Sequence, residues 1–202
     1  HDMVKLKSKP DQSEGGQGMN IVAVNMSFNK NSNKGVSKQY GTITELSDGT
    51  FSAPKITDHM KNSGGGAQYW QVATDNDIVL VNSAGNGLYI NGSMNYDYAL
   101  DPGIWATQVD NNGNLVLGGK MIIVGNWGGT KADGQVVGSK AGHICLDIVA
   151  DKCNDKYRVS DFYILAPGNS VYSSVPGDGY SIMGGSSMAA PQVTGALGIL
   201  HQ

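Results

Sequence analysis

The chain has 202 residues, of which 40% are hydrophobic and 15% charged, with 29 glycines and a formal net charge of −3. This length allows one domain with a sizeable core, and the composition predicts a soluble, loop-rich globular protein. The small negative charge gives no electrostatic basis for binding nucleic acid or an anionic membrane. No apolar run approaches the roughly 20 residues that span a bilayer, and no N-terminal signal peptide is recognisable.

Strands that alternate with helices are predicted along the chain. Residues 1–18 are polar and rich in glycine, and we expect them to be poorly ordered. Compact apolar runs with many β-branched residues predict buried strands, and these runs cover 20–28, 77–83, 121–125 and 161–168. Helices are expected over 53–62 and 67–75, and again after a cluster of small residues near the C-terminus. This alternation indicates an α/β fold with a mainly parallel sheet.

Turn-forming residues connect these elements. Residues 84–87 predict a tight turn directly after the second strand. Residues 104–108 are expected to enter a hairpin whose turn lies at 111–113, and a second hairpin is predicted from 171–174 and 180–183.

The small residues Gly184–Pro191 carry the strongest chemical signal in the chain. An apolar stripe with helical spacing follows them, formed by Val193, Ala196, Leu197 and Leu200. A serine at the start of such a helix lies beside unpaired amides that favour developing negative charge. It can be a nucleophile if a neighbouring group takes its proton, whereas an ordinary N-cap is the alternative for Gly-Ser-Ser.

The full string Gly-Ser-Ser-Met-Ala-Ala-Pro resembles the active-serine motif of the subtilisin-like serine proteases, the subtilases. The family usually has Thr where Ser186 stands and often His where Gln192 stands, and the form Pro-Gln-Val resembles bacterial autotransporter subtilases. Further segments resemble family segments in the same order: 25–28, 81–87, 122–126 and 165–168. The resemblance implies a three-layer, mostly parallel twisted sheet flanked by helices and incomplete at both ends. Residues 1–202 are accordingly predicted to be a single partial peptidase domain.

The same resemblance implies the site residues. Ser187 is the nucleophile of acyl transfer, and the side-chain amide of Asn86 stabilises the oxyanion together with the backbone N–H of Ser187. A turn-forming asparagine beside glycine is the alternative for Asn86. The polypeptide substrate would bind in extended conformation, as an added strand, against two segments: Ser27, Phe28 and Asn29 on one side, and Ser83, Ala84 and Gly85 as the wall of the specificity pocket. Phe28 as a core residue is the alternative at that position.

The Asp and His motifs of the family do not occur in this sequence, and we assign no general base. His201 lies fourteen residues after Ser187, about 21 Å along a helix and therefore too far. His59 and His143 lie in segments without a family match. The chain is a fragment of a larger protease, a short variant with another base, or a chain that only binds peptide. The predicted function is a serine endopeptidase, with an esterase acting on small esters or a non-catalytic fragment as alternatives.

Cys145 and Cys153 are separated by seven residues and can close a short loop. A disulfide is expected if the protein is secreted, and two free thiols are the alternative for a cytosolic protein. The resemblance implies a location outside the bacterial cell or at its surface. We expect no zinc site, because the spacing of His143 and the two cysteines matches no zinc pattern, and no calcium site, because the sequence shows no cluster of oxygen ligands. No cofactor is expected. Self-association through exposed apolar edges of an incomplete sheet is expected.

Overall fold

The computed structural model describes residues 20–27, 44–45, 50–52, 67–91, 93–95, 100–127, 136–137, 143–144 and 157–201. The ranges 1–18 and 53–62, for which the sequence predicts disorder and a helix, lie outside the described residues. Phe28, Asn29, Cys145 and Cys153 lie outside them as well.

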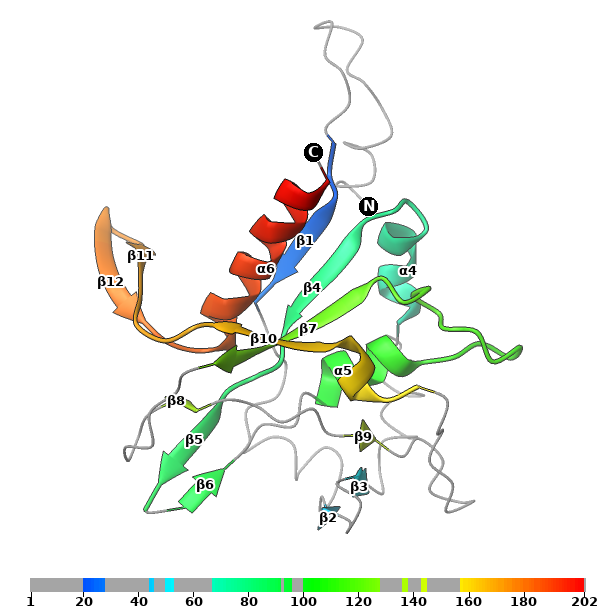
Figure 1. The fold of residues 1–202 in the computed structure, drawn as a ribbon, viewed down its shortest axis with the longest axis horizontal. Helices are drawn as coiled ribbons and strands as arrows, with labels where there is room; N and C mark the ends of the chain where they lie inside the picture. The colour runs from blue at the N-terminus through cyan, green and yellow to red at the C-terminus, as the bar shows by residue number, and fades with distance from the viewer. Residues whose placement is uncertain are drawn as a thin grey trace, which may run out of the picture.

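A parallel four-stranded sheet forms the centre of the described structure (Figure 1). Its strands are β1 (Ala23–Met26), β4 (Val79–Ser83), β7 (Met121–Trp127) and β10 (Tyr163–Pro167), in the spatial order β1-β4-β7-β10. Three strands, β1, β4 and β10, fall within the predicted apolar runs, whereas β7 begins with its run at Met121 and extends two residues past it, to Trp127. The fourth begins two residues later than its run, because the short 3₁₀ helix η1 (Val159–Phe162) leads into it.

Helices cover both faces of this sheet. One face carries α6 (Ser186–Leu200), and the other carries α4 (Gln68–Thr74) and α5 (Leu100–Thr107) (Figure 1). Alternate residues of a strand point to opposite faces, so Leu80 joins the core beneath α4 and α5, whereas Val81 joins the core beneath α6. The two cores confirm the predicted three-layer α/β architecture.

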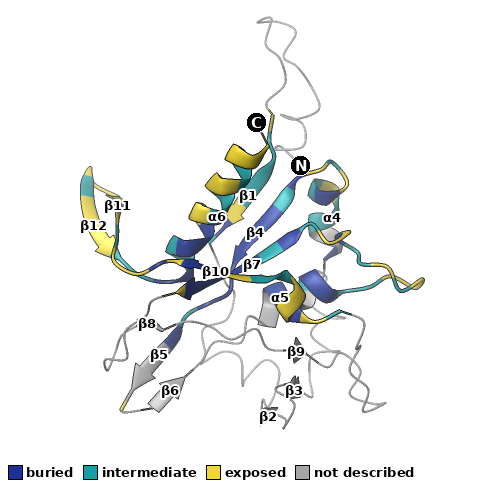
Figure 2. Ribbon diagram, in the orientation of Figure 1, coloured by how far each residue is buried: buried dark blue, intermediate teal, exposed yellow. Residues whose placement is uncertain are grey.

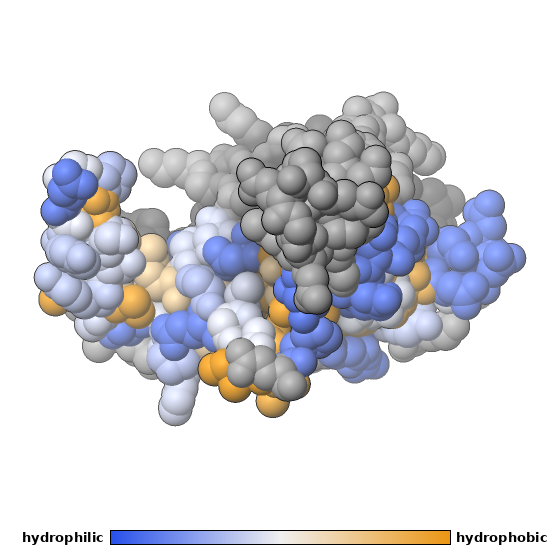
Figure 3. Space-filling model, turned by 90° about the horizontal axis from the view of Figure 1, so that it is seen from above, coloured by the Kyte–Doolittle hydropathy of each residue, from blue (hydrophilic) through white to orange (hydrophobic). Residues whose placement is uncertain are grey.

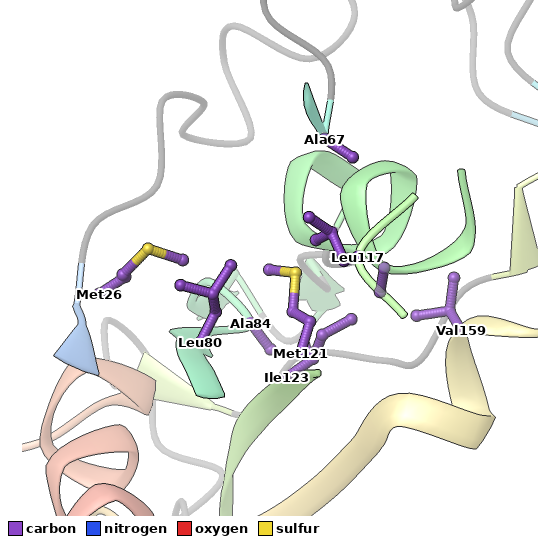
Figure 4. Close-up of a cluster of buried hydrophobic side chains, with 9 residues drawn as sticks. Met26, Ala67, Leu80, Ala84, Leu117, Met121, Ile123 and Val159 are labelled. Carbon is purple, nitrogen blue, oxygen red and sulfur yellow. The ribbon is translucent and has the colours of Figure 1, made fainter. Parts of the chain in front are cut away.

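The larger core lies between β4, β7 and the α4–α5 layer. Figure 4 shows Leu80, Met121 and Ile123 pointing from the strands toward Leu117 and Val159. The smaller core packs the first turns of α6 onto the sheet through Ala189 and Ala190, both fully buried. The methyl-sized side chains bring the start of α6 close to the strand ends.

The remaining strands form small sheets at the margins. The predicted second hairpin is confirmed as β11 (Val171–Val175) paired with β12 (Gly179–Met183). The other strands are β2 (Thr44–Glu45), β3 (Thr50–Ser52), β5 (Gly87–Ile90), β6 (Ser93–Asn95), β8 (Val136–Val137) and β9 (His143–Ile144).

Two local predictions were wrong. Residues 84–87 do not form a tight turn: 84–86 are an irregular connection in which Gly85 has a φ of 92°, and strand β5 begins at Gly87. Residues 104–107 belong to helix α5 and not to a hairpin strand. The predicted turn at 111–113 is confirmed: the Gly113 N–H donates to the Asp110 carbonyl at 3.0 Å, and one antiparallel bridge pairs Val109 with Leu115. The helix is favoured by tertiary packing, since Trp105 lies against Trp70 of α4 with ring centroids 5.6 Å apart.

Exposure follows the layers. Buried residues gather in β4, β7 and the first turn of α6, whereas the outer side of α6 is exposed (Figure 2). On the described surface seen from above, apolar residues are scattered among hydrophilic ones (Figure 3). No helix in the described ranges is both long enough and apolar enough to cross a membrane.

Candidate active site

The predicted catalytic residues, and the described part of the predicted substrate site, lie where strand ends face the start of α6 (Figure 1). Ser27 directly follows β1, Asn86 lies three residues after β4, and Gly168 directly follows β10. Ser187 is the second residue of α6. Binding sites of parallel α/β sheets form at this carboxyl edge of the strands.

The helix N-terminus is capped by a residue from a distant part of the chain. The N-cap residue of α6 is Gly185, with φ of 144° and no side chain to accept an amide. Asn86 fills this role, because its Oδ1 accepts the backbone N–H of Ser186 at 2.8 Å. A Cβ on Gly185 would lie 2.9 Å from the same Oδ1. Glycine therefore permits both the backbone angle and the close approach of Asn86.

This cap fixes the orientation of the Asn86 amide. A backbone N–H can only donate, so the atom facing Ser186 must be the carbonyl oxygen, and Nδ2 points elsewhere. Nδ2 has no acceptor among the described residues. In the first turn of α6, Met188 and Ala189 donate their N–H groups to the Gly185 carbonyl at 3.0 and 3.2 Å. The N–H of Ser187 likewise has no acceptor among the described residues.

The two adjacent serines are in different environments. Ser186 is fully buried, and its Oγ lies 2.8 Å from the Gly85 carbonyl and 3.0 Å from Asn86 Oδ1. Ser187 is partly exposed, and its Oγ lies 3.5 Å from the Ser27 carbonyl, which is at the limit of a hydrogen bond. The Ser186 hydroxyl is thus buried and hydrogen-bonded, whereas the Ser187 hydroxyl makes only one long hydrogen bond among the described residues.

No base reaches Ser187 within the described residues. Neither an imidazole nor a carboxylate among them hydrogen-bonds its Oγ. His201 is the C-cap at the opposite end of α6. His143 lies in β9 and His59 lies outside the described ranges. The described part of the chain also holds no group of three His, Cys, Asp or Glu that could bind a metal.

The described residues of the two expected substrate segments lie side by side at the sheet. Met26 of β1 pairs with Asn82 of β4. The next residue in each segment, Ser27 directly after β1 and Ser83 at the end of β4, therefore lies beside the other. Ser83 and Ala84 are buried, and the Ala84 methyl packs into the larger core.

Sequence reasoning missed the contacts behind the turn that precedes Ser187. The Gly185 N–H donates to the Gly168 carbonyl at 2.7 Å. A Cβ on Gly168 would overlap the Gly185 carbonyl oxygen and would lie 2.8 Å from Asn126 Oδ1. Gln192 Nε2 donates to the Pro167 carbonyl. The dipeptide Pro167-Gly168 signals only the end of a strand, so nothing in the local sequence points to this packing.

Comparisons with known proteins identify the family. The model of the subtilase family matches residues 9–202, and the chain belongs to that family. It is 29% identical to subtilisin DY of Bacillus licheniformis over 153 residues, which are 61% of this chain and 52% of that protein. It is 42% identical to subtilisin-like protease 2 of Plasmodium falciparum over 45 residues, or 22% of this chain and 3% of that protein. The chain thus spans about half the length of subtilisin DY.

Several solved protease structures are similar to the chain, and two of them serve as examples. The S41 psychrophilic protease has a TM-score of 0.38 and 20% identity, with 96% of this chain and 47% of that chain covered. Sphericase has a TM-score of 0.36 and 21% identity, with 70% of this chain and 44% of that chain covered.

Proposed function

We propose that the protein is a serine endopeptidase in which Ser187 Oγ attacks the scissile carbonyl. The observation that carries the proposal is a pair of donors at the start of α6 that have no acceptor among the described residues: the Ser187 backbone N–H, and the side-chain amide of Asn86, whose Oδ1 accepts the N–H of the preceding residue, Ser186. Acyl transfer develops negative charge on the carbonyl oxygen, and preorganised donors stabilise that charge. The positive end of the α6 dipole acts in the same direction.

Attack also requires that the hydroxyl proton be taken up. Serine is a weak nucleophile without a base, and among the described residues the hydrogen-bond acceptor of Ser187 Oγ is the Ser27 carbonyl, which is not a base. The sequence carries neither the Asp nor the His motif of the family, and a site that has lost triad members keeps only about 10³- to 10⁴-fold acceleration over water from its oxyanion hole and binding. We therefore expect slow acylation by this chain alone.

An extended polypeptide is the proposed substrate. Ser27, Phe28 and Asn29 would pair with one side of it, and Ser83, Ala84 and Gly85 would form the wall of the pocket for the side chain before the scissile bond. Strand addition binds a peptide through its main chain, and the parallel pairing of Met26 with Asn82 supports two such neighbouring segments.

Ser187→Ala is expected to abolish covalent labelling by a fluorophosphonate probe, because the probe reacts with an activated serine. Labelling is measured by intact mass, with turnover of casein and p-nitrophenyl acetate followed in parallel. The control is Ser174→Ala, at an exposed serine of the β11–β12 hairpin. Ester turnover without casein cleavage would favour the esterase alternative. A parent chain that neither labels nor turns over either substrate would favour the non-catalytic alternative and contradict the proposal.

We further propose secretion or display at the bacterial surface, with a Cys145–Cys153 disulfide. Both cysteines lie outside the described residues, so the proposal rests on their spacing and on the family. Alkylation of the unreduced protein should leave its intact mass unchanged. A mass increase equal to two alkyl groups would refute the disulfide.

A further inference from the structure

Helix α6 contains a proline four residues after the proposed nucleophile. Pro191 lies inside the helix, and a proline has no backbone N–H to donate to the carbonyl of the residue four positions earlier. That carbonyl belongs to Ser187. The residue that carries the nucleophilic hydroxyl therefore has a main-chain acceptor that its own helix does not satisfy in the usual way.

A side chain at the end of strand β1 supplies the missing donor. Ser27 Oγ donates to the Ser187 carbonyl at 2.9 Å, across 160 positions of sequence. Ser27 directly follows β1, one of the strands onto which α6 packs. The hydroxyl of Ser27 thus takes the place of the N–H that Pro191 lacks, and it connects β1 to the nucleophile residue.

Asn25 completes a directed chain of hydrogen bonds. Its side-chain amide lies beside the Ser27 hydroxyl, with Nδ2 2.9 Å and Oδ1 3.1 Å from Ser27 Oγ. The Ser187 carbonyl can only accept, so the single Ser27 hydroxyl proton is directed at it. Asn25 must then donate through Nδ2 to Ser27 Oγ. Polarisation along such a chain strengthens each bond.

We infer that Ser27 is a positioning residue for the nucleophile, and that Pro191 makes this role available by freeing the Ser187 carbonyl. The catalytic consequence of this inference rests on the proposed function. The replacement of the missing Pro191 N–H by the Ser27 hydroxyl, which we call the donor replacement, does not rest on it. A helix that satisfied the carbonyl internally would leave Ser187 attached to β1 only through the 3.5 Å contact of its own Oγ. The bond from Ser27 holds the nucleophile residue at a fixed place relative to the strand that lines the proposed substrate site.

A double-mutant cycle on the full chain tests the donor replacement. Ser27→Ala leaves the Ser187 carbonyl without its donor, and Pro191→Ala supplies a new N–H within the helix. The stabilisation gained from Pro191→Ala should be greater in the Ser27→Ala background, by about fivefold in the unfolding equilibrium constant, which is the effect of one hydrogen bond. Urea unfolding of the four proteins gives this ratio. Additive effects of the two substitutions would overturn the inference.

The labelling rate of Ser187 separates positioning from a merely structural bond. Ser27→Ala should slow fluorophosphonate labelling by about tenfold, since small misplacements of a nucleophile are costly. Pro191→Ala should restore the stability of this variant but not its labelling rate, whereas Ser27→Thr, which keeps the hydroxyl, should restore both. Full recovery of labelling in the double variant would refute positioning. If the parent chain is not labelled, the proposed function fails, and the double-mutant stability cycle alone tests the donor replacement.

Asn25→Asp provides an independent check on the direction of the chain. A carboxylate only accepts hydrogen bonds, so it would draw the Ser27 proton away from the Ser187 carbonyl. We expect this variant to lower the labelling rate in the same way as Ser27→Ala and to have no further effect when combined with it. An Asn25→Asp protein that labels at the parental rate would contradict the assigned direction.

Discussion

Asn86→Asp is expected to lower ester and casein turnover by about 10²- to 10³-fold while the free energy of unfolding stays close to that of the parent chain. Loss of one oxyanion donor has an effect of about this size in subtilisin, a member of the same family. Aspartate keeps the oxygen that accepts the Ser186 N–H at 2.8 Å, and its negative charge is favourable at a helix N-terminus. It lacks the Nδ2 donor, and its charge opposes an oxyanion beside it.

Asn86→Ala separates the two roles of this residue. Alanine removes both the donor and the cap, so we expect a comparable loss of turnover together with a loss of about 1 kcal/mol in the free energy of unfolding. Asn111→Asp, at an exposed turn position, is the matched control and should change neither quantity. Unchanged turnover in Asn86→Asp would rule out the side-chain amide as the oxyanion donor and leave Asn86 with a capping role only.

Gly168→Ala is the second substitution for which we expect a large effect. Its Cβ would overlap the Gly185 carbonyl oxygen and would lie 3.0 Å from the Ala189 Cβ. A backbone oxygen cannot move aside as a flexible side chain can, so the turn before Ser187 must shift. Overpacking of this kind costs about 1–3 kcal/mol. We expect a lower midpoint in urea unfolding and slower labelling of Ser187.

Gly195→Ala is the control for this substitution, because a Cβ at Gly195 would meet nothing within 4 Å. Alanine is the better helix former, so this variant should be more stable by about 0.5–1 kcal/mol. It should also label at the parental rate. A Gly168→Ala protein that matches the parent in both stability and labelling would show that the segment after β10 does not hold the turn before Ser187 in place.

The sequence alone determined the elements that depend on local patterns. Compact apolar runs were sufficient to predict the four strands of the central sheet, and helical spacing was sufficient for α4 and α6. The prediction was wrong at 84–87 and at 104–107. In the second range, a short apolar run is compatible with either a strand or a helix, and contact between Trp105 and Trp70 accompanies the helix.

Resemblance to a family motif directed attention to Ser187 and Asn86, but only the tertiary structure decided how they are held. The α6 cap is Asn86 rather than the adjacent Ser186, although they are 100 positions apart. The donor to the Ser187 carbonyl is Ser27, 160 positions away, since Pro191 cannot supply one within the helix. Hydrogen bonds of this kind depend on which strand ends meet the helix in space. That meeting is set by the packing of α6 on the sheet, and no local pattern in the sequence encodes it.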